Sequence, residues 1–531
     1  MEAYPIMMKE AEQARFNALL RWSKEHGGTV HPDLEIYKDD VTGYSMRVKP
    51  SSTREAETTI KSGEEVLRCS MDTSLSFLNA VTDGPIVAGP SKHLPEPRPA
   101  FSPRFMEIQP HVIGHFYLMK QYLLGKDSFW YPYISTLPQP DSISSWSLPP
   151  FWPDEDFEFL EGTNAAVAAQ EIQANAKRDF KAARKILKEE GFQDWQDYTR
   201  HLFNWAFSMF ASRSFRPSLV TPTSFQEREL PRNVRIDDFS MLLPVYDIIN
   251  HDIKANVRWT AEQQGDGSEA CRFVTFDSYR PGQQVFNTYG KKTNSELLLS
   301  YGFMLPETEA FHNDYVHLRK KESSTPINAE NAGALDATGT PSSDKQTPKD
   351  FLVSLRPMSH PSSFVGQNMN LVAKEAASDL RPEFSHVEDA LVWDLCLSLV
   401  GGDDAKENFI AKVLGAAREA EPPTPDSQRA REQDALRNIL SASTSLPREV
   451  GAVVEHVKEL LLAKLGMEYD KFCEADPGMG VDDEGNEVEF EVEPQTRNQG
   501  VALQYRRQVK KVFENAIGAL VPDWKEAAGE E

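Results

Sequence analysis

The sequence predicts an α+β protein: a β-rich first part that contains a helical insert, followed by a mainly α-helical second part. Strand-like segments bounded by turn signals lie between residues 16 and 80 and again between 241 and 303. Between these regions, at about 107–230, apolar residues recur every three or four positions, as in helices. The same spacing dominates the C-terminal part, and a chain of 531 residues is long enough for two or three domains.

The N-terminal region is predicted to combine a helix with short strands. The helix ends at Gly27-Gly28, because glycine is favoured directly after a helix. Tyr44–Val48 and Val66–Cys69 have the composition of strands. Residues 82–104 are rich in Pro and Gly and are predicted to form a surface loop.

Two stripes of apolar residues predict the helices of the insert. The first stripe ends before Gly191, and the second follows Asp194, a residue type that is suited to cap a helix. Helical spacing alone explains both stripes, which favours a role in the core over a ligand site. The stripes consist of Ala165, Ala168, Ile172, Ala176, Phe180, Ala183 and Leu187, and of Tyr198, Leu202, Trp205 and Met209.

Strands are predicted again after residue 241. Arg272–Asp277 and Gln284–Tyr289 are strand-like in composition, and they flank the turn signal Arg280-Pro281-Gly282. We therefore expect these two segments to pair as a hairpin.

The C-terminal part is predicted to be mainly helical. One helix starts near Pro447 and stops at Gly466, and another ends before Pro522. Residues 322–350, rich in Ser, Thr, Pro, Asn and Ala, are predicted to be a flexible linker. Residues 474–493 contain nine carboxylates and no Lys or Arg, which is typical of a solvated loop or of a docking surface for a basic substrate.

Composition and charge exclude several function classes. Hydrophobic residues at 40% and charged residues at 26% describe a soluble globular protein. No apolar run approaches the roughly 18 residues of a transmembrane helix, and no secretory signal is evident at the start. A formal net charge of −24 argues against direct nucleic-acid binding and suits a basic partner, although acidity also serves solubility alone. We expect no membrane association, and a monomer.

The cysteines give no sign of a metal site. No two of the four form a Cys-x-x-Cys pair, so we expect no zinc site and no other metal. Sparse cysteines also argue against disulfides and favour a reducing compartment, the cytoplasm and possibly the nucleus. The cysteines are Cys69, Cys271, Cys396 and Cys473.

The most informative feature is a pair of motifs about forty residues apart. The first, Asp247-Ile248-Ile249-Asn250-His251, closes an apolar run. The second is Tyr289-Gly290-x-x-x-Asn294-x-Glu296-Leu297-x-x-x-Tyr301-Gly302-Phe303. In this order and spacing, they resemble the catalytic core of SET-domain protein methyltransferases, in the branch that contains the Rubisco large-subunit methyltransferase. The resemblance covers most of residues 16–310.

The resemblance implies a domain organisation. Residues 1–315 would form a SET domain with a helical insert at about 107–230. In such a domain, the segment before Asn-His and the strand around Tyr-Gly wind past each other in a pseudoknot. Residues 316–531, with the linker at about 322–350, would form a helical domain that binds the protein substrate.

The resemblance also implies a cofactor, S-adenosyl-L-methionine, and a set of site residues. The phenol of Tyr289 would lie beside the transferring methyl group, and Asp247 and Tyr301 would line the substrate channel. Arg213 is suited to the carboxylate of the cofactor, because a guanidinium offers paired donors. Ser45 departs from the family's Gly-x-Gly turn, since it replaces the second glycine. The cofactor-binding residues would be Thr42, Gly43, Tyr44, Arg213, Asn250, His251 and Phe303.

Five of these residues also have an alternative structural role. Tyr289 could be a buried strand aromatic, and His251 a core histidine with satisfied hydrogen bonds. Arg213 could form a structural salt bridge, Asp247 could cap the end of a strand, and Phe303 could pack in the core.

The leading hypothesis is an S-adenosylmethionine-dependent protein-lysine N-methyltransferase that acts on a non-histone protein, such as a ribosomal protein or a translation elongation factor. One alternative is a protein-histidine N-methyltransferase, since an actin-histidine methyltransferase shares this architecture. Another is a catalytically inactive SET-like binding module, which the departure at Ser45 would favour. A nucleotide-binding enzyme has no support, because the sequence lacks a Gly-x-Gly-x-x-Gly motif and a phosphate loop.

Overall fold

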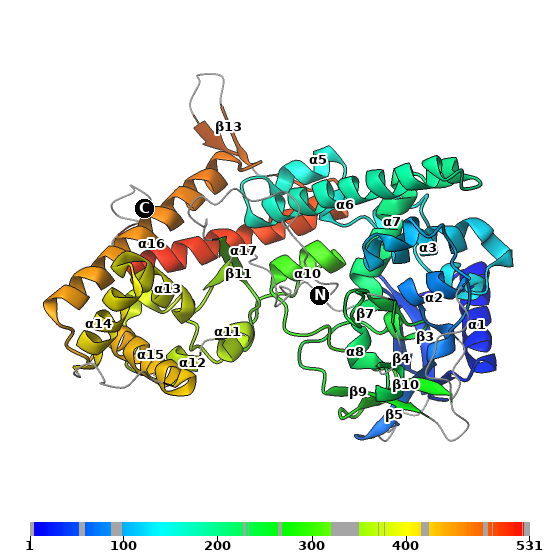
Figure 1. Ribbon diagram of the computed structural model, residues 1–531, viewed down its shortest axis with the longest axis horizontal. Coiled ribbons are helices and arrows are strands. Elements are labelled where there is room, and N and C mark those ends of the chain that lie inside the picture. The colour runs from blue at the N-terminus through cyan, green and yellow to red at the C-terminus, as the bar shows by residue number, and fades with distance from the viewer. Residues whose placement is uncertain are drawn as a thin grey trace. The chain divides into compact units, whose positions relative to one another are not determined.

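The computed structural model packs into two compact units (Figure 1). The first unit contains the described residues of Met1–Phe151 and Ile172–Gly290, and the second those of Trp152–Glu171, Lys291–Ala332 and Asp344–Glu531. Each unit has its own hydrophobic core. The structure describes residues 5–51, 59–86, 98–226, 230–231, 233–263, 268–319, 350–369, 371–375, 378–415, 424–481, 487–490, 492–522 and 524.

Three antiparallel sheets form the β-rich part of the first unit, with strand orders β1-β3-β4, β2-β5-β10-β9 and β6-β8-β7. Apolar side chains on one face of these strands enter the core, because successive residues of a strand point to opposite faces. The strands are β1 (Pro5–Ile6), β2 (Thr29–Val30), β3 (Leu34–Asp39), β4 (Gly43–Val48), β5 (Glu64–Ser70), β6 (Leu75–Ser76), β7 (Ser214–Phe215), β8 (Met241–Leu242), β9 (Val257–Gln263) and β10 (Glu269–Thr275). The strands predicted at 44–48 and 66–69 are confirmed as β4 and β5.

The predicted hairpin between Arg272–Asp277 and Gln284–Tyr289 is wrong. Strand β10 pairs with β9 and β5, and the second segment lies between two earlier parts of the chain. Its backbone N–H groups donate to the carbonyl oxygen of Met46 at 2.9 Å and to that of Asn250 at 2.8 Å. Strand-like composition predicts an extended segment but does not identify its partner, so the nearer strand was the wrong choice.

The small sheet β6-β8-β7 joins three distant parts of the sequence. Leu242 on the central strand β8 lies opposite both Leu75 and Ser214. Arg213 directly precedes Ser214, and Asp247 follows β8 by five residues. The sheet therefore brings these two charged residues into the same region.

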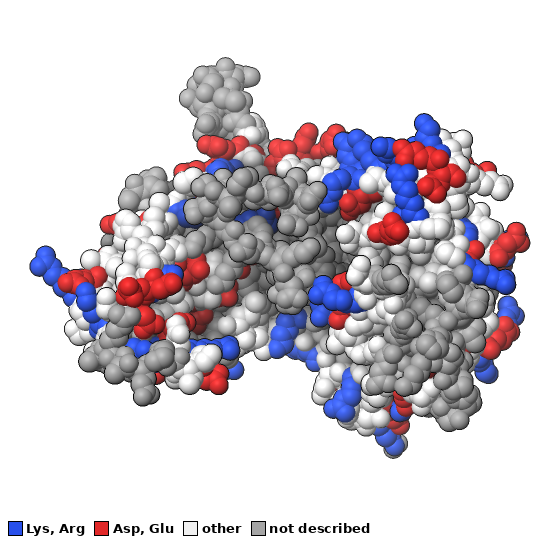
Figure 2. All heavy atoms as spheres, viewed as in Figure 1, with Lys and Arg blue, Asp and Glu red and all other residues white. Residues whose placement is uncertain are grey.

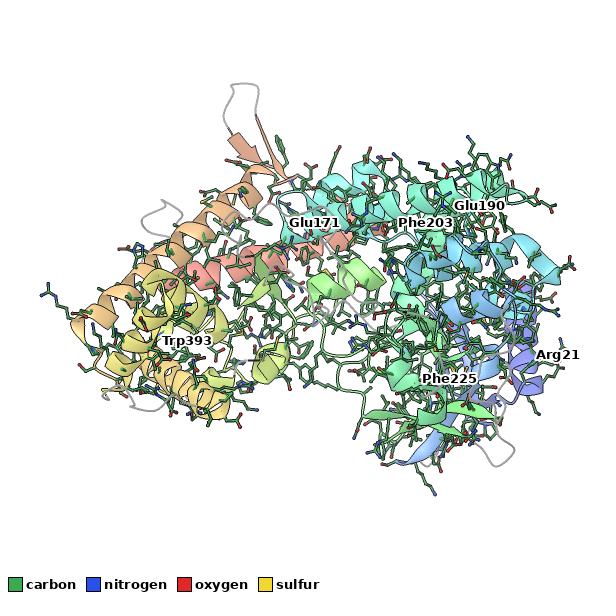
Figure 3. The ribbon with its side chains drawn as sticks, in the orientation of Figure 1. Arg21, Glu171, Glu190, Phe203, Phe225 and Trp393 are labelled. Carbon is green, nitrogen blue, oxygen red and sulfur yellow. The ribbon has the colours of Figure 1, made fainter. Side chains whose placement is uncertain are left out.

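Helices cover the rest of the first unit. The predicted helix before Gly27 is confirmed, and so are both predicted helices of the insert, α6 and α7. Phe203 on α7 lies within this helical part, with 1% of its surface exposed (Figure 3). The helices are α1 (Glu10–Glu25), α2 (Phe77–Thr82), α3 (Pro110–Leu124), α4 (Tyr131–Ile134), α6 (Asn164–Glu189, of which residues 164–171 belong to the second unit), α7 (Arg200–Arg213), α8 (Pro217–Val220) and α9 (Thr223–Gln226).

Asp194 does not cap α7 as predicted. Its backbone is left-handed, with φ of 55°, and the N-cap is Thr199. The hydroxyl of Thr199 accepts a hydrogen bond from the backbone N–H of Leu202 at 3.2 Å, which is the usual N-cap contact. Both residue types are favoured at this position, so the sequence alone did not identify the cap.

The second unit is mainly helical, with two small antiparallel strand pairs, β11–β12 and β13–β14. Trp393 on α13 packs against the core of this unit (Figure 3). The strands are β11 (Tyr315–Arg319), β12 (Asp350–Ser354), β13 (Met479–Val481) and β14 (Glu487–Glu489). The helices are α5 (Asp154–Phe157), α10 (Asn294–Tyr301), α11 (Phe364–Met369), α12 (Leu371–Glu375), α13 (Asp389–Val400), α14 (Asp403–Leu414), α15 (Pro425–Leu440), α16 (Arg448–Glu474) and α17 (Arg497–Leu520).

The predicted helix stop at Gly466 is wrong, because α16 continues to Glu474. A glycine within a helix costs about 1 kcal/mol, and the buried side chains on both sides of it, Leu465 and Tyr469, offset that cost. The predicted start at Pro447 is confirmed as the N-cap of α16.

The predicted α+β fold class, with a mainly helical C-terminal part, is confirmed. The division at residues 315/316 stays a prediction, since the two compact units part at Gly290 and residues 152–171 belong to the second unit. Most of the predicted linker at 322–350 lies outside the described residues, as do residues 87–97 of the predicted loop. Parts of the acidic segment lie outside them too, namely residues 482–486 and 491.

Two further observations concern membranes and metals. In the described part of the chain, no helix is long and apolar enough to cross a membrane. Within those same residues, His, Cys, Asp and Glu side chains form no cluster of three or more that could hold a metal ion.

Candidate functional site

Tyr289 and His251 form the centre of the candidate site, which lies in the first unit. The backbone N–H of Tyr289 donates to Nδ1 of His251 at 3.0 Å. Because Nδ1 accepts, a neutral His251 carries its proton on Nε2. The residue also forms a parallel backbone bridge with Asn287, and the N–H of Asp252 donates to the carbonyl of Asn287 at 2.9 Å. The two motifs therefore lie side by side.

The phenol of Tyr289 is held in place and kept neutral. Its hydroxyl donates to the backbone carbonyl of Ile249 at 3.1 Å. Burial raises the pKa of Tyr289 to about 12, an effect that Arg213 opposes and Asp247 reinforces. The neutral phenol can orient a neighbouring group, but it cannot act as a base near pH 7.

Asp247 is a buried carboxylate that pairs with one cation, Arg213, among the described residues. Only 1% of its side chain is exposed, compared with 27% for Arg213. Its Oδ2 accepts hydrogen bonds from Nη1 of Arg213 at 3.2 Å and from the hydroxyl of Tyr133 at 2.9 Å. Burial raises the pKa of Asp247, against the opposing effect of Arg213. In the described part of the structure, Oδ1 of Asp247 and Nε of Arg213 have no hydrogen-bond partner, and both atoms are shielded from solvent.

Strained backbone precedes Asp247. Val245 has φ of 76°, a left-handed conformation that a β-branched residue rarely adopts. The residue is buried, with 3% of its surface exposed, and it is the N-cap of the short 3₁₀ turn Tyr246–Ile248. Such strain persists only where the surrounding structure enforces it, and it clusters at functional sites. The strain therefore points to a constraint on where the carboxylate of Asp247 lies.

The predicted cofactor turn connects β3 to β4. Gly43 has φ of 75°, which favours glycine. The side chain of Tyr44 is committed elsewhere, because its hydroxyl donates to Glu12 at 2.7 Å and its ring lies 4.6 Å from that of Phe16. Only the backbone of Tyr44 remains for a ligand. The hydroxyl of Thr42 donates to Oδ2 of a buried carboxylate, Asp39, at 2.6 Å.

Ser45 connects this turn to the Asn-His motif. It is completely buried, and the amide nitrogen of Asn250 donates to its hydroxyl. The two residues are 205 positions apart in the sequence. The serine that replaces the family's glycine therefore contacts a predicted site residue directly.

Tyr301 and Phe303 belong to the second unit. Tyr301 ends α10, Gly302 caps it with a left-handed backbone, and the rings of Tyr301 and Phe303 lie 6.2 Å apart. Two other motif residues have structural roles there. Glu296 accepts from the backbone N–H of Thr293 at 2.7 Å and completes the capping box of α10, and the amide of Asn294 holds the carbonyl of Leu305.

The structure brings most of the predicted site residues of the first unit together, and it adds others that the sequence analysis missed. Contacts connect Tyr289 with His251 and Arg213 with Asp247, and Thr42 reaches Asn250 through Ser45. Tyr133 was missed, since it is 114 positions from Asp247 and belongs to no motif. Asn287 was missed as well, although its place two residues before Tyr289 was a usable signal.

Solved structures have the same fold. A crystal structure of the SET domain of LSMT bound to methyllysine and S-adenosylhomocysteine matches with a TM-score of 0.53 at 16% identity, over 99% of this chain and 94% of that one. A structure of Rubisco LSMT bound to S-adenosylmethionine matches with a TM-score of 0.51, over 98% and 93%. The chain therefore has the fold of these proteins.

Curated relatives are protein methyltransferases. The ribosomal lysine N-methyltransferase set10 of Schizosaccharomyces pombe is 29% identical over 228 residues, 41% of this chain and 38% of that protein. The actin-histidine N-methyltransferase of Homo sapiens is 23% identical over 295 residues, 54% and 42%. The N-lysine methyltransferase setd6 of Salmo salar is 27% identical over 194 residues, 36% and 39%. The chain thus spans about two fifths of the length of these relatives.

No protein-family model matches the chain. The resemblance to SET-domain protein methyltransferases of the Rubisco LSMT-like branch is nevertheless confirmed, by the solved structures for the fold and by the curated relatives for the sequence.

Proposed function

We propose that this protein is an S-adenosylmethionine-dependent protein-lysine N-methyltransferase. The observation that carries the proposal is the contact between the two motifs. The ring of Tyr289 stacks on His251, and its phenol O–H donates a hydrogen bond to the carbonyl of Ile249. This arrangement joins segments about forty residues apart around one half-buried phenol. Similarity to lysine methyltransferases supports the same reaction.

The donor set of the site fits the cofactor. S-adenosylmethionine supplies an electrophilic methyl group on a sulfonium. The guanidinium of Arg213, on a side chain that is 27% exposed, suits the carboxylate of its amino-acid part, and the turn at Thr42, Gly43 and Tyr44 is exposed or half-buried and could contact the remainder. Asn250 and His251 complete the proposed cofactor site in the first unit. We include Phe303 of the second unit as the proposed support for the adenine ring.

The protein's part in the reaction is to position and desolvate the target nitrogen. A lysine has a reference pKa of about 10.4, and an apolar environment lowers that value, because it disfavours the ammonium form. The neutral phenol of Tyr289 would orient the amine, and Asp247 and Tyr301 would line its channel. No dedicated general base is needed.

The proposed substrate is a basic non-histone protein, a ribosomal protein or a translation elongation factor, encountered in the cytoplasm or the nucleus. The net charge of −24 and the similarity to the ribosomal lysine N-methyltransferase set10 of Schizosaccharomyces pombe support this choice. Among the described residues visible in Figure 2, acidic and basic side chains are interspersed, so charge alone does not identify the docking surface. We propose that the substrate docks on the helical domain at residues 316–531.

Two alternatives have specific support. Similarity to an actin-histidine N-methyltransferase favours a histidine target, since the same site could methylate an imidazole nitrogen. Ser45, at the position of a family glycine, favours a binding module without activity.

Labelling with tritiated S-adenosylmethionine separates these readings. The purified protein is incubated with the tritiated cofactor and a cell extract, and the labelled band is digested and its modified residue identified by mass spectrometry. We expect methyllysine in a basic protein. Methylhistidine would replace the lysine assignment. Absence of label, together with no heat of cofactor binding in calorimetry, would overturn the enzyme assignment in favour of a binding module.

A further inference from the structure

A chain of side-chain hydrogen bonds starts at Asp39 and ends at Asn250. The hydroxyl of Thr42 lies 2.6 Å from Oδ2 of Asp39 and 2.8 Å from the hydroxyl of Ser45. The amide nitrogen of Asn250 donates to that same serine hydroxyl. Asp39 and Ser45 are both buried, with exposed fractions of 2% and 0%.

The proton positions in this chain follow from its chemistry. A carboxylate only accepts hydrogen bonds, so the single proton of Thr42 points to Asp39. Ser45 then donates its own proton within the cluster, to Thr42 at 2.8 Å, to Asp39 at 3.5 Å or to the phenol of Tyr37. With its proton directed there, Ser45 can only accept in its contact with Asn250, so the amide atom that faces it must be a donor. An amide offers a donor only at Nδ2, so Nδ2 of Asn250 faces the serine.

The consequence is a fixed orientation of the Asn250 amide. With Nδ2 held by Ser45, Oδ1 of Asn250 points away from the serine. No described residue donates to Oδ1, and Asn250 is partly exposed, so this oxygen is available to a ligand. A glycine at position 45 would leave the amide free to rotate and to present either end.

We propose that Ser45 is a positioning residue for the cofactor: through Thr42 and Asp39 it orients Asn250 so that Oδ1 accepts an N–H donor, the α-ammonium group of S-adenosylmethionine. The inference rests on the proposed function. The inference also explains why a serine can stand in place of the family's glycine: its hydroxyl forms hydrogen bonds that fix the neighbouring side chains, which a glycine cannot do. Ser45 acts through Asn250 and does not touch the reacting atoms.

The experiment measures cofactor affinity by isothermal titration calorimetry with S-adenosylmethionine and with S-adenosylhomocysteine. Ser45→Ala removes the hydroxyl with little change in volume. We expect its dissociation constants to rise about tenfold, since an oriented hydrogen bond contributes about 1–1.5 kcal/mol. In the radiolabel assay, KM for the cofactor rises by the same factor and kcat stays within about twofold. Ser45→Gly, which restores the family residue, weakens binding in the same direction.

The control is Ser208→Ala. Ser208 is also completely buried in the first unit, and its hydroxyl has no partner in the described part of the structure, so its loss should leave affinity unchanged. If Ser45→Ala fails to fold, Thr42→Val tests the network from an exposed position. This variant should raise the dissociation constant about threefold.

The outcomes separate the two proposals. If the wild-type protein binds neither ligand, the proposed function fails. If the wild-type protein binds and both Ser45→Ala and Thr42→Val bind equally well, the positioning role is wrong. A lower melting temperature of Ser45→Ala with unchanged affinity would likewise reduce Ser45 to a structural residue.

Discussion

The imidazole of His251 lies parallel to the ring of Tyr289, with centroids 5.0 Å apart and planes 18° apart. The backbone N–H of Tyr289 also donates to Nδ1 of the same imidazole. Two contacts therefore fix the phenol: the stack holds the plane of its ring, and the carbonyl of Ile249 holds its hydroxyl. These contacts remain separable, because only the second needs the hydroxyl.

Tyr289→Phe separates them. The variant keeps the ring and its stack on His251 but loses the hydroxyl. We expect turnover in the radiolabel assay to fall about 100-fold, since loss of an orienting contact has this effect on a positioned reaction. Cofactor affinity measured by calorimetry should stay within about twofold of the wild type.

The matched control is Tyr198→Phe, a buried tyrosine elsewhere in the same unit, which should leave turnover unchanged. The pH profile provides a second check. Burial raises the pKa of Tyr289 to about 12, so the phenol stays protonated below about pH 10. The pH profile of turnover should therefore show no inflection from loss of the phenol proton in that range. Full turnover by Tyr289→Phe would remove the phenol from the mechanism.

The ion pair of Arg213 and Asp247 should respond asymmetrically to substitution. Arg213→Met leaves a carboxylate, 1% exposed, without its cation, which should lower the free energy of unfolding by about 3–5 kcal/mol. Asp247→Asn leaves an arginine that water can reach and should cost about 1 kcal/mol or less. The double variant should regain most of the stability lost in Arg213→Met. Urea unfolding measures all three.

An exposed pair serves as the control. Arg104 and Glu189 are 52% and 40% exposed, so Arg104→Met should change the free energy of unfolding by no more than about 0.5 kcal/mol. Equal losses in Asp247→Asn and Arg213→Met would contradict the asymmetry and show that burial does not dominate at Asp247.

Asp314 should make the stability of the second unit depend on pH. Only 2% of the residue is exposed, Oδ1 accepts from the amide of Asn294 at 2.8 Å, and Oδ2 has no partner among the described residues. Burial raises the pKa of Asp314 to about 6, above the value of about 3.9 in an unfolded chain. Its contribution to stability is therefore fully present below about pH 4 and is lost as pH rises through 6.

Asp314→Asn removes this titration. We expect the variant to match the wild type near pH 4 and to exceed it in free energy of unfolding by on the order of 2 kcal/mol at pH 8. Urea unfolding at several pH values measures the difference. Asp403→Asn, at a fully exposed side chain, should show no such trend. A variant less stable than the wild type at pH 8 would mean that Asp314 is ionised in the native state at little cost.

Local features of the fold could be predicted from the sequence, and long-range partners could not. Strands β4 and β5 follow from their strand-like composition, and helices α6 and α7 follow from the spacing of their apolar residues. The site around Tyr289 and His251 follows from two motifs in a fixed order. In contrast, nothing local predicts that Gln284–Tyr289 runs beside Asn250, since an extended segment fits many partners.

The ends of helices were also hard to predict, because packing decided them. Gly466 is an ordinary stop signal that the apolar face of α16 overrides.

The contacts of Ser45 with Asn250 and of Tyr133 with Asp247 cross 205 and 114 positions, and only the folded chain brings them together.

Neither unit is a continuous stretch of sequence. Helix α6 gives residues 164–171 to the second unit, where Tyr505 donates to Asn164 at 2.8 Å and Arg319 pairs with Glu171 at 2.7 Å. A gene cut at codon 290 would thus yield a shortened polypeptide whose Trp152–Glu171 segment has lost its apolar partners, and it should aggregate or be degraded. Producing the first unit alone would require excising that internal segment and bridging the gap with a short linker.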